Sequence, residues 1–202
     1  MNEGTPVLSI DGPMATLTLC RASQRNSLND DDLHMLLSHL EAIEATPSVQ
    51  VVVLRAETSG QPQPVFSAGY HVGGFAQDAM APLFFEKIPQ ALEQLSAVTV
   101  CALNGSVYGG ATDLVLACDF CIAMQGVHWR MPACALGLHY YPTGLRRYVS
   151  RFGLHWSKRA FLLGQTMRIE DLAATQAFEA VVSHEHFERS LQDLIAKLTR
   201  MA

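Results

Sequence analysis

The chain has 202 residues, of which 49% are hydrophobic and 16% are charged, and its formal net charge at pH 7 is −5. This length and apolar content suit one compact domain with a single substantial core. No basic run or stripe of Lys and Arg is present, so we exclude nucleic acid as a partner.

The N-terminal segment and the cysteines favour a cytoplasmic protein. Residues 1–6 are polar and acidic, unlike the start of a secretory signal, and no apolar run is long enough to span a membrane. Four of the five cysteines stand among apolar neighbours, which predicts buried and reduced thiols: Cys20, Cys101, Cys118 and Cys134. Cys118 and Cys121 form a C-x-x-C motif, but no second pair follows, so we expect no metal site.

The first predicted elements are a hairpin and a helix. Residues 7–10 and 16–20 alternate apolar and polar side chains around Asp11-Gly12-Pro13, whose residue types favour a turn. From Asp30 onward leucines recur at helical spacing, and Asn29 or Asp30 is available as the N-cap. We expect this helix to cover a sheet.

Strands and helices then alternate along the chain. Residues 49–54 and 98–103 are mostly apolar and rich in β-branched side chains, which is typical of strands buried on both faces. A helix at about 82–95 separates them, and a further strand is predicted at 120–123. A basic helix is predicted at 142–153, and helices predominate from there onward. This order of elements predicts the α/β class.

The first candidate functional segment is a loop between two of these strands. A cluster of turn-forming residues at 59–64 precedes Phe66-Ser-Ala-Gly-Tyr-His71 and Gly73-Gly74. Binding and catalytic residues concentrate in loops that a rigid scaffold holds, so we expect this loop to carry function.

A second glycine loop follows the strand at 98–103 and leads into an apolar helix. A helix that begins at Gly109-Gly110 offers unpaired N–H groups and a partial positive charge, which stabilise an oxygen that gains negative charge. Close packing of helix on strand, or a bound phosphate, would also account for the paired glycines. The spacing does not match G-x-G-x-x-G, so we expect no nucleotide cofactor.

Together, Phe66-Ser-Ala-Gly-Tyr70 and residues 102–113 closely resemble the two signature loops of the enoyl-CoA hydratase/isomerase (crotonase) family. Further resemblance lies in the segments 21–28, 117–123 and 131–144. The resemblance implies one crotonase-like domain over residues 1–202. It would comprise a repeated ββα spiral core at 1–150 and a shortened helical C-terminal region at 151–202.

The resemblance also implies a chemistry and a set of site residues. In that family two backbone N–H groups hold the carbonyl oxygen of an acyl thioester while an enolate forms, and these groups correspond to Tyr70 and Gly110 here. The substrate-binding positions carried over in the same way are Arg21, Ala22, Arg25, Ala68, His71 and Gly109. No cofactor or metal is implied beyond coenzyme A, or a carrier protein, as part of the substrate. Fatty acid metabolism and a trimer-based homo-oligomer are further implications.

The chain departs from the family at both catalytic glutamates of its hydratases. The first position is Asp113, which keeps the carboxylate with a reach shorter by about 1.5 Å. It is either an acid or base beside the bound carbonyl or a first-turn acid that complements the helix dipole. The second position is Ala133, which cannot transfer a proton, so we do not expect water addition by the two-glutamate route.

The segment from Gly137 to Pro142 contains His139, Tyr140 and Tyr141. It resembles the methylmalonyl-CoA decarboxylase branch of the family, which also has a tyrosine at the place of Tyr140 and a small apolar residue at the place of Ala133. Tyr140 is therefore the second candidate acid, although a tyrosine packed under the loop with its hydroxyl bonded to the backbone would look the same in sequence.

Two hypotheses follow. The first is a lyase or isomerase that acts on an acyl-CoA through an enolate, more a decarboxylase or isomerase than a hydratase. The second is a non-catalytic acyl-thioester-binding homologue, which Ala133 and the short C-terminal region support. The basic residues of the predicted helices are expected to form a solvated face or to contact CoA phosphates: Arg146, Arg147, Arg151, Lys158 and Arg159.

Overall fold

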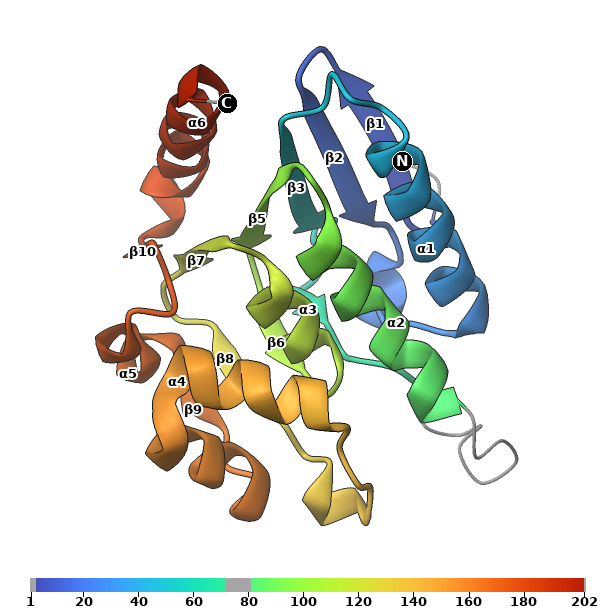
Figure 1. The fold of residues 1–202 in the computed structure, drawn as a ribbon. Helices are drawn as coiled ribbons and strands as arrows, with labels where there is room; N and C mark the ends of the chain where they lie inside the picture. Colours follow the sequence, from blue (N-terminus) through green and yellow to red (C-terminus); the bar gives the residue numbers. More distant parts are fainter. Residues whose placement is uncertain (1–2, 72–80, 202) are drawn as a thin grey trace.

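The computed structural model describes residues 3–71 and 81–201, which form two β-sheets with helices packed on them (Figure 1). The larger sheet has the strand order β1-β2-β3-β5-β7-β10. These strands are Val7–Asp11, Met14–Leu19, Val51–Ala56, Val98–Leu103, Phe120–Met124 and Ala180–Val182. β1 pairs antiparallel with β2, whereas the other neighbouring pairs are parallel. The predicted N-terminal hairpin is confirmed.

The smaller sheet has the strand order β4-β6-β8-β9. These strands are Val65–Ser67, Ser106–Tyr108, His128–Arg130 and Met167–Arg168. β4, β6 and β8 pair in parallel, and β9 is antiparallel to β8. Because parallel strands end at the same edge of a sheet, the segments that leave β4 and β6 lie side by side.

Three successive units each give one strand to the larger sheet, one strand to the smaller sheet and then a helix. They are β3-β4-α2, β5-β6-α3 and β7-β8-α4, with α2 at Ala81–Gln94, α3 at Ala111–Ala117 and α4 at Pro142–Leu162. This arrangement confirms the repeated ββα core. In Figure 1 α2 lies between α3 and α1, the helix at Asp30–Glu44, and it contacts both. The short α5, at Ile169–Leu172, and α6, at His184–Met201, complete the chain.

The N-terminus of α1 has the predicted cap. The side chain of Asn29 accepts a hydrogen bond from the N–H of Asp32 at 3.0 Å, and the carboxylate of Asp32 accepts one from the N–H of Asn29 at 2.9 Å. This reciprocal pair satisfies two N–H groups that a helix start leaves without intrahelical partners. The apolar face of the helix is buried, as its spacing predicts, through Leu33, Leu36, Leu40 and Ile43.

The helix predicted at 142–153 extends to Leu162 and is interrupted at Gly153. Gly153 has φ +74° and ψ 166°, and the helix resumes beyond it to Leu162. Positive φ is open to glycine without a steric penalty, so the chain bends there and continues as a second helical segment. Within the described residues, no helix combines the length and apolar character needed to cross a membrane.

The predicted burial of the cysteines is confirmed for Cys20, Cys101 and Cys118 but is wrong for Cys134. Cys134 begins the short 3-10 turn Cys134–Leu136, whose residues are all exposed. Apolar neighbours in sequence predicted burial, but this turn lies on the surface. The Gly73-Gly74 pair lies outside the described residues.

Candidate active site

The two glycine loops meet at the common edge of β4 and β6. Gly69 has φ +88°, and a Cβ built on it would lie 2.6 Å from the carbonyl oxygen of Tyr108 and 3.3 Å from the Cα of Gly109. No side chain fits there, so glycine is required both for the backbone conformation and for the close approach of the loops. This contact brings the segment around Tyr70 beside the start of α3 at Gly110.

The first loop is held from its other side by the segment 25–28. The N–H of Leu28 donates to the carbonyl of Gly69 at 2.9 Å, and the N–H of His71 donates to the carbonyl of Leu28 at 2.8 Å. These bonds form a parallel bridge between Leu28 and Tyr70. Because N–H directions alternate along an extended segment, the N–H of Tyr70 faces away from this bridge.

Gly110 is the N-cap of α3 and makes no side-chain cap hydrogen bond. The N–H groups of Thr112 and Asp113 donate to the carbonyls of Gly109 and Gly110 at 3.1 and 2.9 Å. A Cβ on Gly110 would lie 2.8 Å from the ring of Phe85, a buried residue of α2. The ring of Tyr70 lies 6.0 Å from that of Phe85, and its hydroxyl donates to the carboxylate of Asp30. Phe85 could not be identified from the sequence, because one aromatic residue on an apolar helical face carries no functional signal.

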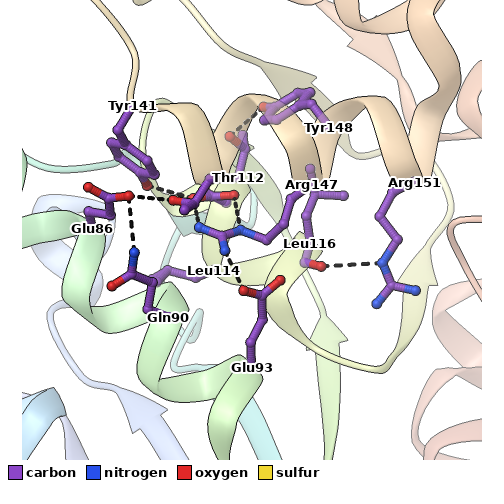
Figure 2. Close-up of polar contacts among 12 residues, drawn as sticks. Glu86, Gln90, Glu93, Thr112, Leu114, Leu116, Tyr141, Arg147, Tyr148 and Arg151 are labelled. Atoms are coloured by element: carbon purple, nitrogen blue, oxygen red, sulfur yellow. Dashed lines mark hydrogen bonds and ion pairs between the residues drawn. The ribbon is translucent and has the colours of Figure 1, made fainter.

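Asp113 is fully buried and ion-paired. Its oxygens accept from Nε and Nη2 of Arg147 at 2.7 and 2.8 Å, and from the hydroxyl of Tyr141 at 2.5 Å. Arg147 also donates to the half-exposed carboxylate of Glu93 at 2.6 Å. Figure 2 shows Arg147 reaching from α4 toward α2, with a dashed line from its guanidinium to Glu93. The carboxylate of Asp113 is thus occupied by a bidentate cation and a hydroxyl.

The expectation that Arg147 belongs to a solvated or phosphate-binding basic face is wrong. Its side chain is 4% exposed, because α4 crosses α3 where Asp113 lies. Two other members of that basic set also make local contacts. Arg151 donates to the carbonyls of Leu116 and Asp119 at the end of α3, and Arg159 lies 4.9 Å from the ring centroid of Trp156.

Tyr140 and Tyr141 stack on each other above Asp113. Their ring centroids are 4.3 Å apart, and their hydroxyl oxygens are 3.1 Å apart. Burial raises the pKa of the Tyr140 hydroxyl well above its ordinary value, and the charge of Asp113 raises it further. Burial and the same charge also raise the pKa of Tyr141. Both hydroxyls therefore keep their protons near neutral pH. The alternative of a tyrosine packed under the loop assumed a hydroxyl bonded to the backbone, but here the hydroxyls bond to side chains.

Gly144 of α4 supports the two stacked rings. A Cβ at this position would lie 2.4 Å from Cε1 of Tyr140 and 2.7 Å from Cε2 of Tyr141. We expect Gly144→Ala to displace both rings and to lower the free energy of unfolding by about 1–3 kcal/mol, the usual cost of overpacking. Urea unfolding measures this change. Gly4→Ala, where a Cβ meets nothing within 4 Å, is the control, and an equal effect in both variants would contradict the packing.

The segment that contains Arg21 and Arg25 lies beside the first loop. The N–H of Ala68 donates to the carbonyl of Arg25 at 2.8 Å, and the Arg25 guanidinium lies 5.9 Å from the ring centroid of Tyr108. Arg21 instead forms an ion pair with Asp32 at 2.7 Å. Arg25 is therefore close to both glycine loops, while Arg21 is anchored to α1.

The remaining candidates are dispersed around the loops. Ala22 is buried, and its carbonyl accepts from the side chain of Gln61 at 2.8 Å. His71 and His139 are exposed, and Ala133 is 5% exposed just before the 3-10 turn that leads toward α4. No described residues cluster in a way that would hold a metal ion.

Two Escherichia coli enzymes are similar to this chain in sequence. The 2,3-dehydroadipyl-CoA hydratase of Escherichia coli (strain K12) is 28% identical over 178 residues, which cover 87% of this chain and 66% of that protein. The methylmalonyl-CoA decarboxylase of the same organism is 25% identical over 162 residues, which cover 78% of this chain and 59% of that protein. The chain therefore spans less than two thirds of the length of either relative.

The fold matches solved structures as well. The structure of Pseudomonas aeruginosa DspI superposes with a TM-score of 0.88 at 24% identity, over 100% of this chain and 78% of that one. A likeness at this identity concerns the fold alone, and it agrees with the two-sheet spiral. A family model described as enoyl-CoA hydratase/isomerase matches residues 10–202. Because this match spans nearly the whole chain, the protein belongs to the enoyl-CoA hydratase/isomerase family.

Proposed function

We propose that this protein binds an acyl thioester, carried on coenzyme A, and stabilises an enolate formed on it. The amides of Tyr70 and Gly110 would donate to the thioester oxygen. The observation that carries this proposal is the contact of Gly69 with Tyr108 and Gly109, which brings the two loops together at one edge of the smaller sheet. Two fixed donors stabilise a developing oxyanion without reorganising as charge forms.

The residues at the two positions of the hydratase glutamates favour decarboxylation over hydration. Hydration by two carboxylates needs one free carboxylate at each of two positions, but Asp113 is held by Arg147 and Tyr141, and the other position is Ala133. The relatives include both a hydratase and a decarboxylase, so this preference rests on the residues at the two positions.

Decarboxylation requires only the oxyanion donors and a source of one proton. The bond between the α-carbon and the carboxylate breaks, carbon dioxide leaves, and the electron pair moves through the α-carbon onto the thioester oxygen. The enolate then takes a proton at the α-carbon, which we assign to the hydroxyl of Tyr140. Its raised pKa keeps this hydroxyl protonated and disfavours the base that an isomerase needs to remove a proton first.

A non-catalytic acyl-thioester-binding protein is the second candidate. The ring of Phe85 lies against Gly110, and the one carboxylate of α3 is fully buried in an ion pair. Both features would suit a site that retains the loops without turnover.

A substrate panel with Tyr140→Phe tests the proposal. We expect release of carbon dioxide from malonyl-CoA or methylmalonyl-CoA, at a rate that Tyr140→Phe lowers by about 10²-fold, the low end for loss of a general acid. Because the pKa of Tyr140 is raised, its acid form persists as pH increases, and the rate should not fall between pH 7 and about 10. A decarboxylation assay across this pH range measures both effects.

The other members of the panel distinguish the alternatives. Fast hydration of crotonyl-CoA that survives Asp113→Asn would overturn the decarboxylase assignment, and turnover of a 3-enoyl-CoA would favour an isomerase. Binding of every ester without turnover would favour the non-catalytic candidate. The family likeness also supports a trimer-based assembly, which light scattering on the eluted protein tests.

A further inference from the structure

The polar chain behind Tyr140 has a fixed direction. Arg147 holds the carboxylate of Asp113 through two hydrogen bonds, so that carboxylate acts only as an acceptor. Tyr141 has one O–H, and it donates to Asp113 at 2.5 Å. The contact of 3.1 Å between the two tyrosine hydroxyls therefore has Tyr140 as its donor and Tyr141 as its acceptor.

The ring positions are fixed as firmly as the hydroxyls. The two rings stack at 4.3 Å, Gly144 leaves no space for them to settle toward α4, and the ring of Phe161 lies 5.2 Å from that of Tyr140. Rotation of the Tyr140 O–H is thus the main remaining freedom, and the oxygen of Tyr141 determines where that O–H points in the absence of substrate.

We propose that Tyr141 is a positioning residue for Tyr140, and that Asp113 acts on the reaction through Tyr141 rather than by contact with the substrate. The inference rests on the proposed function in that Tyr140 is the proton donor. The ion pair with Arg147 keeps Asp113 charged and immobile, Asp113 orients Tyr141, and Tyr141 holds the proton of Tyr140 until the enolate carbon competes for it.

Tyr141→Phe is the direct variant, because it keeps the stacked ring and removes only the hydroxyl. We expect kcat to fall by about 10- to 10²-fold, since small misplacements of a catalytic group have effects of this size, while KM stays nearly constant. Tyr148→Phe is the matched control. The hydroxyl of Tyr148 is also buried on α4, donates to Thr112 at 2.6 Å and accepts from Trp129 at 3.1 Å, outside the chain from Tyr140 to Asp113.

A double-mutant cycle tests whether Asp113 acts through Tyr141. If it does, Asp113→Asn should lower kcat in the wild type but add almost nothing in the Tyr141→Phe background. Independent, multiplicative losses would show that Asp113 acts on the substrate directly and would overturn the inference. The kcat values are compared per mole of folded protein. If Asp113→Asn fails to fold, the comparison of Tyr141→Phe with Tyr148→Phe still tests the inference.

A readout without turnover separates this inference from the proposed function. In protein labelled with ¹³C at the Cζ atom of tyrosine, Tyr140→Phe assigns the Tyr140 resonance. We expect Tyr141→Phe to move that resonance and Tyr148→Phe to leave it in place. Equal resonances and equal kcat values in the two variants would overturn the positioning role. Absence of turnover by the wild type on the whole panel would overturn the proposed function instead, with the NMR result still deciding the positioning.

Discussion

Replacing Arg147 with methionine is expected to lower the free energy of unfolding by about 3–5 kcal/mol, because it leaves the carboxylate of Asp113 buried without its cation. Asp113 is 0% exposed and receives two of its three side-chain hydrogen bonds from Arg147. Neither solvent nor the remaining partner, Tyr141, replaces the lost charge. Urea unfolding followed by circular dichroism measures the change.

Two controls show whether the unpaired charge is the cause. Arg146→Met changes the exposed neighbour and should alter stability by no more than about 0.5 kcal/mol. The double variant Asp113→Leu/Arg147→Met removes both charges and should be more stable than Arg147→Met alone, because buried pairs can be replaced by apolar side chains at little cost. If the double variant is no more stable than Arg147→Met, the loss of stability comes from lost packing and not from the unpaired charge.

Gly69→Ala is expected to reduce turnover on the order of 10²–10³-fold, the size of the loss when one oxyanion donor is removed. The new Cβ would lie 2.6 Å from the carbonyl oxygen of Tyr108, which is backbone and cannot rotate away. The two loops must therefore separate, and the amide of Tyr70 moves away from Gly110. Steady-state kinetics on the ester that the wild type turns over best measures the loss.

Gly126→Ala is the matched control for the backbone strain. Gly126 has φ +79°, close to the +88° of Gly69, but a Cβ on it meets nothing within 4 Å. Both variants should lose about 1–2 kcal/mol of stability from the left-handed backbone, and Gly69→Ala should additionally lose activity. Equal kinetics in the two variants would show that the loop contact does not support turnover.

Much of the fold follows from local sequence patterns. The alternation on either side of Asp11-Gly12-Pro13 gives the hairpin of β1 and β2, and the leucine spacing after Asn29 gives α1 with its reciprocal cap. The β-branched segments at 49–54 and 98–103 became adjacent parallel strands, because a mostly apolar run is stable only where both faces are covered.

Only part of the candidate site could be predicted from local sequence patterns. The glycine loops were located through their family likeness, and the roles of Tyr70, Gly110, Asp113 and Tyr140 remain predictions. The partnership of Asp113 with Arg147 was not foreseen. One signal was available, since Arg147 stands three residues after Gly144 on the same side of α4, and a charged residue on a buried helical face needs a buried partner.

The sequence by itself determined the α/β class, the N-terminal hairpin, the buried strands at 49–54 and 98–103 and the cap of α1, because each depends on residues near one another in the chain. The tertiary structure alone decided that Cys134 is exposed, that Phe85 lies against Gly110, and that the carboxylate at the start of α3 is ion-paired instead of free. These features depend on which helices pack together, and a side chain's environment is set by neighbours that are distant in sequence.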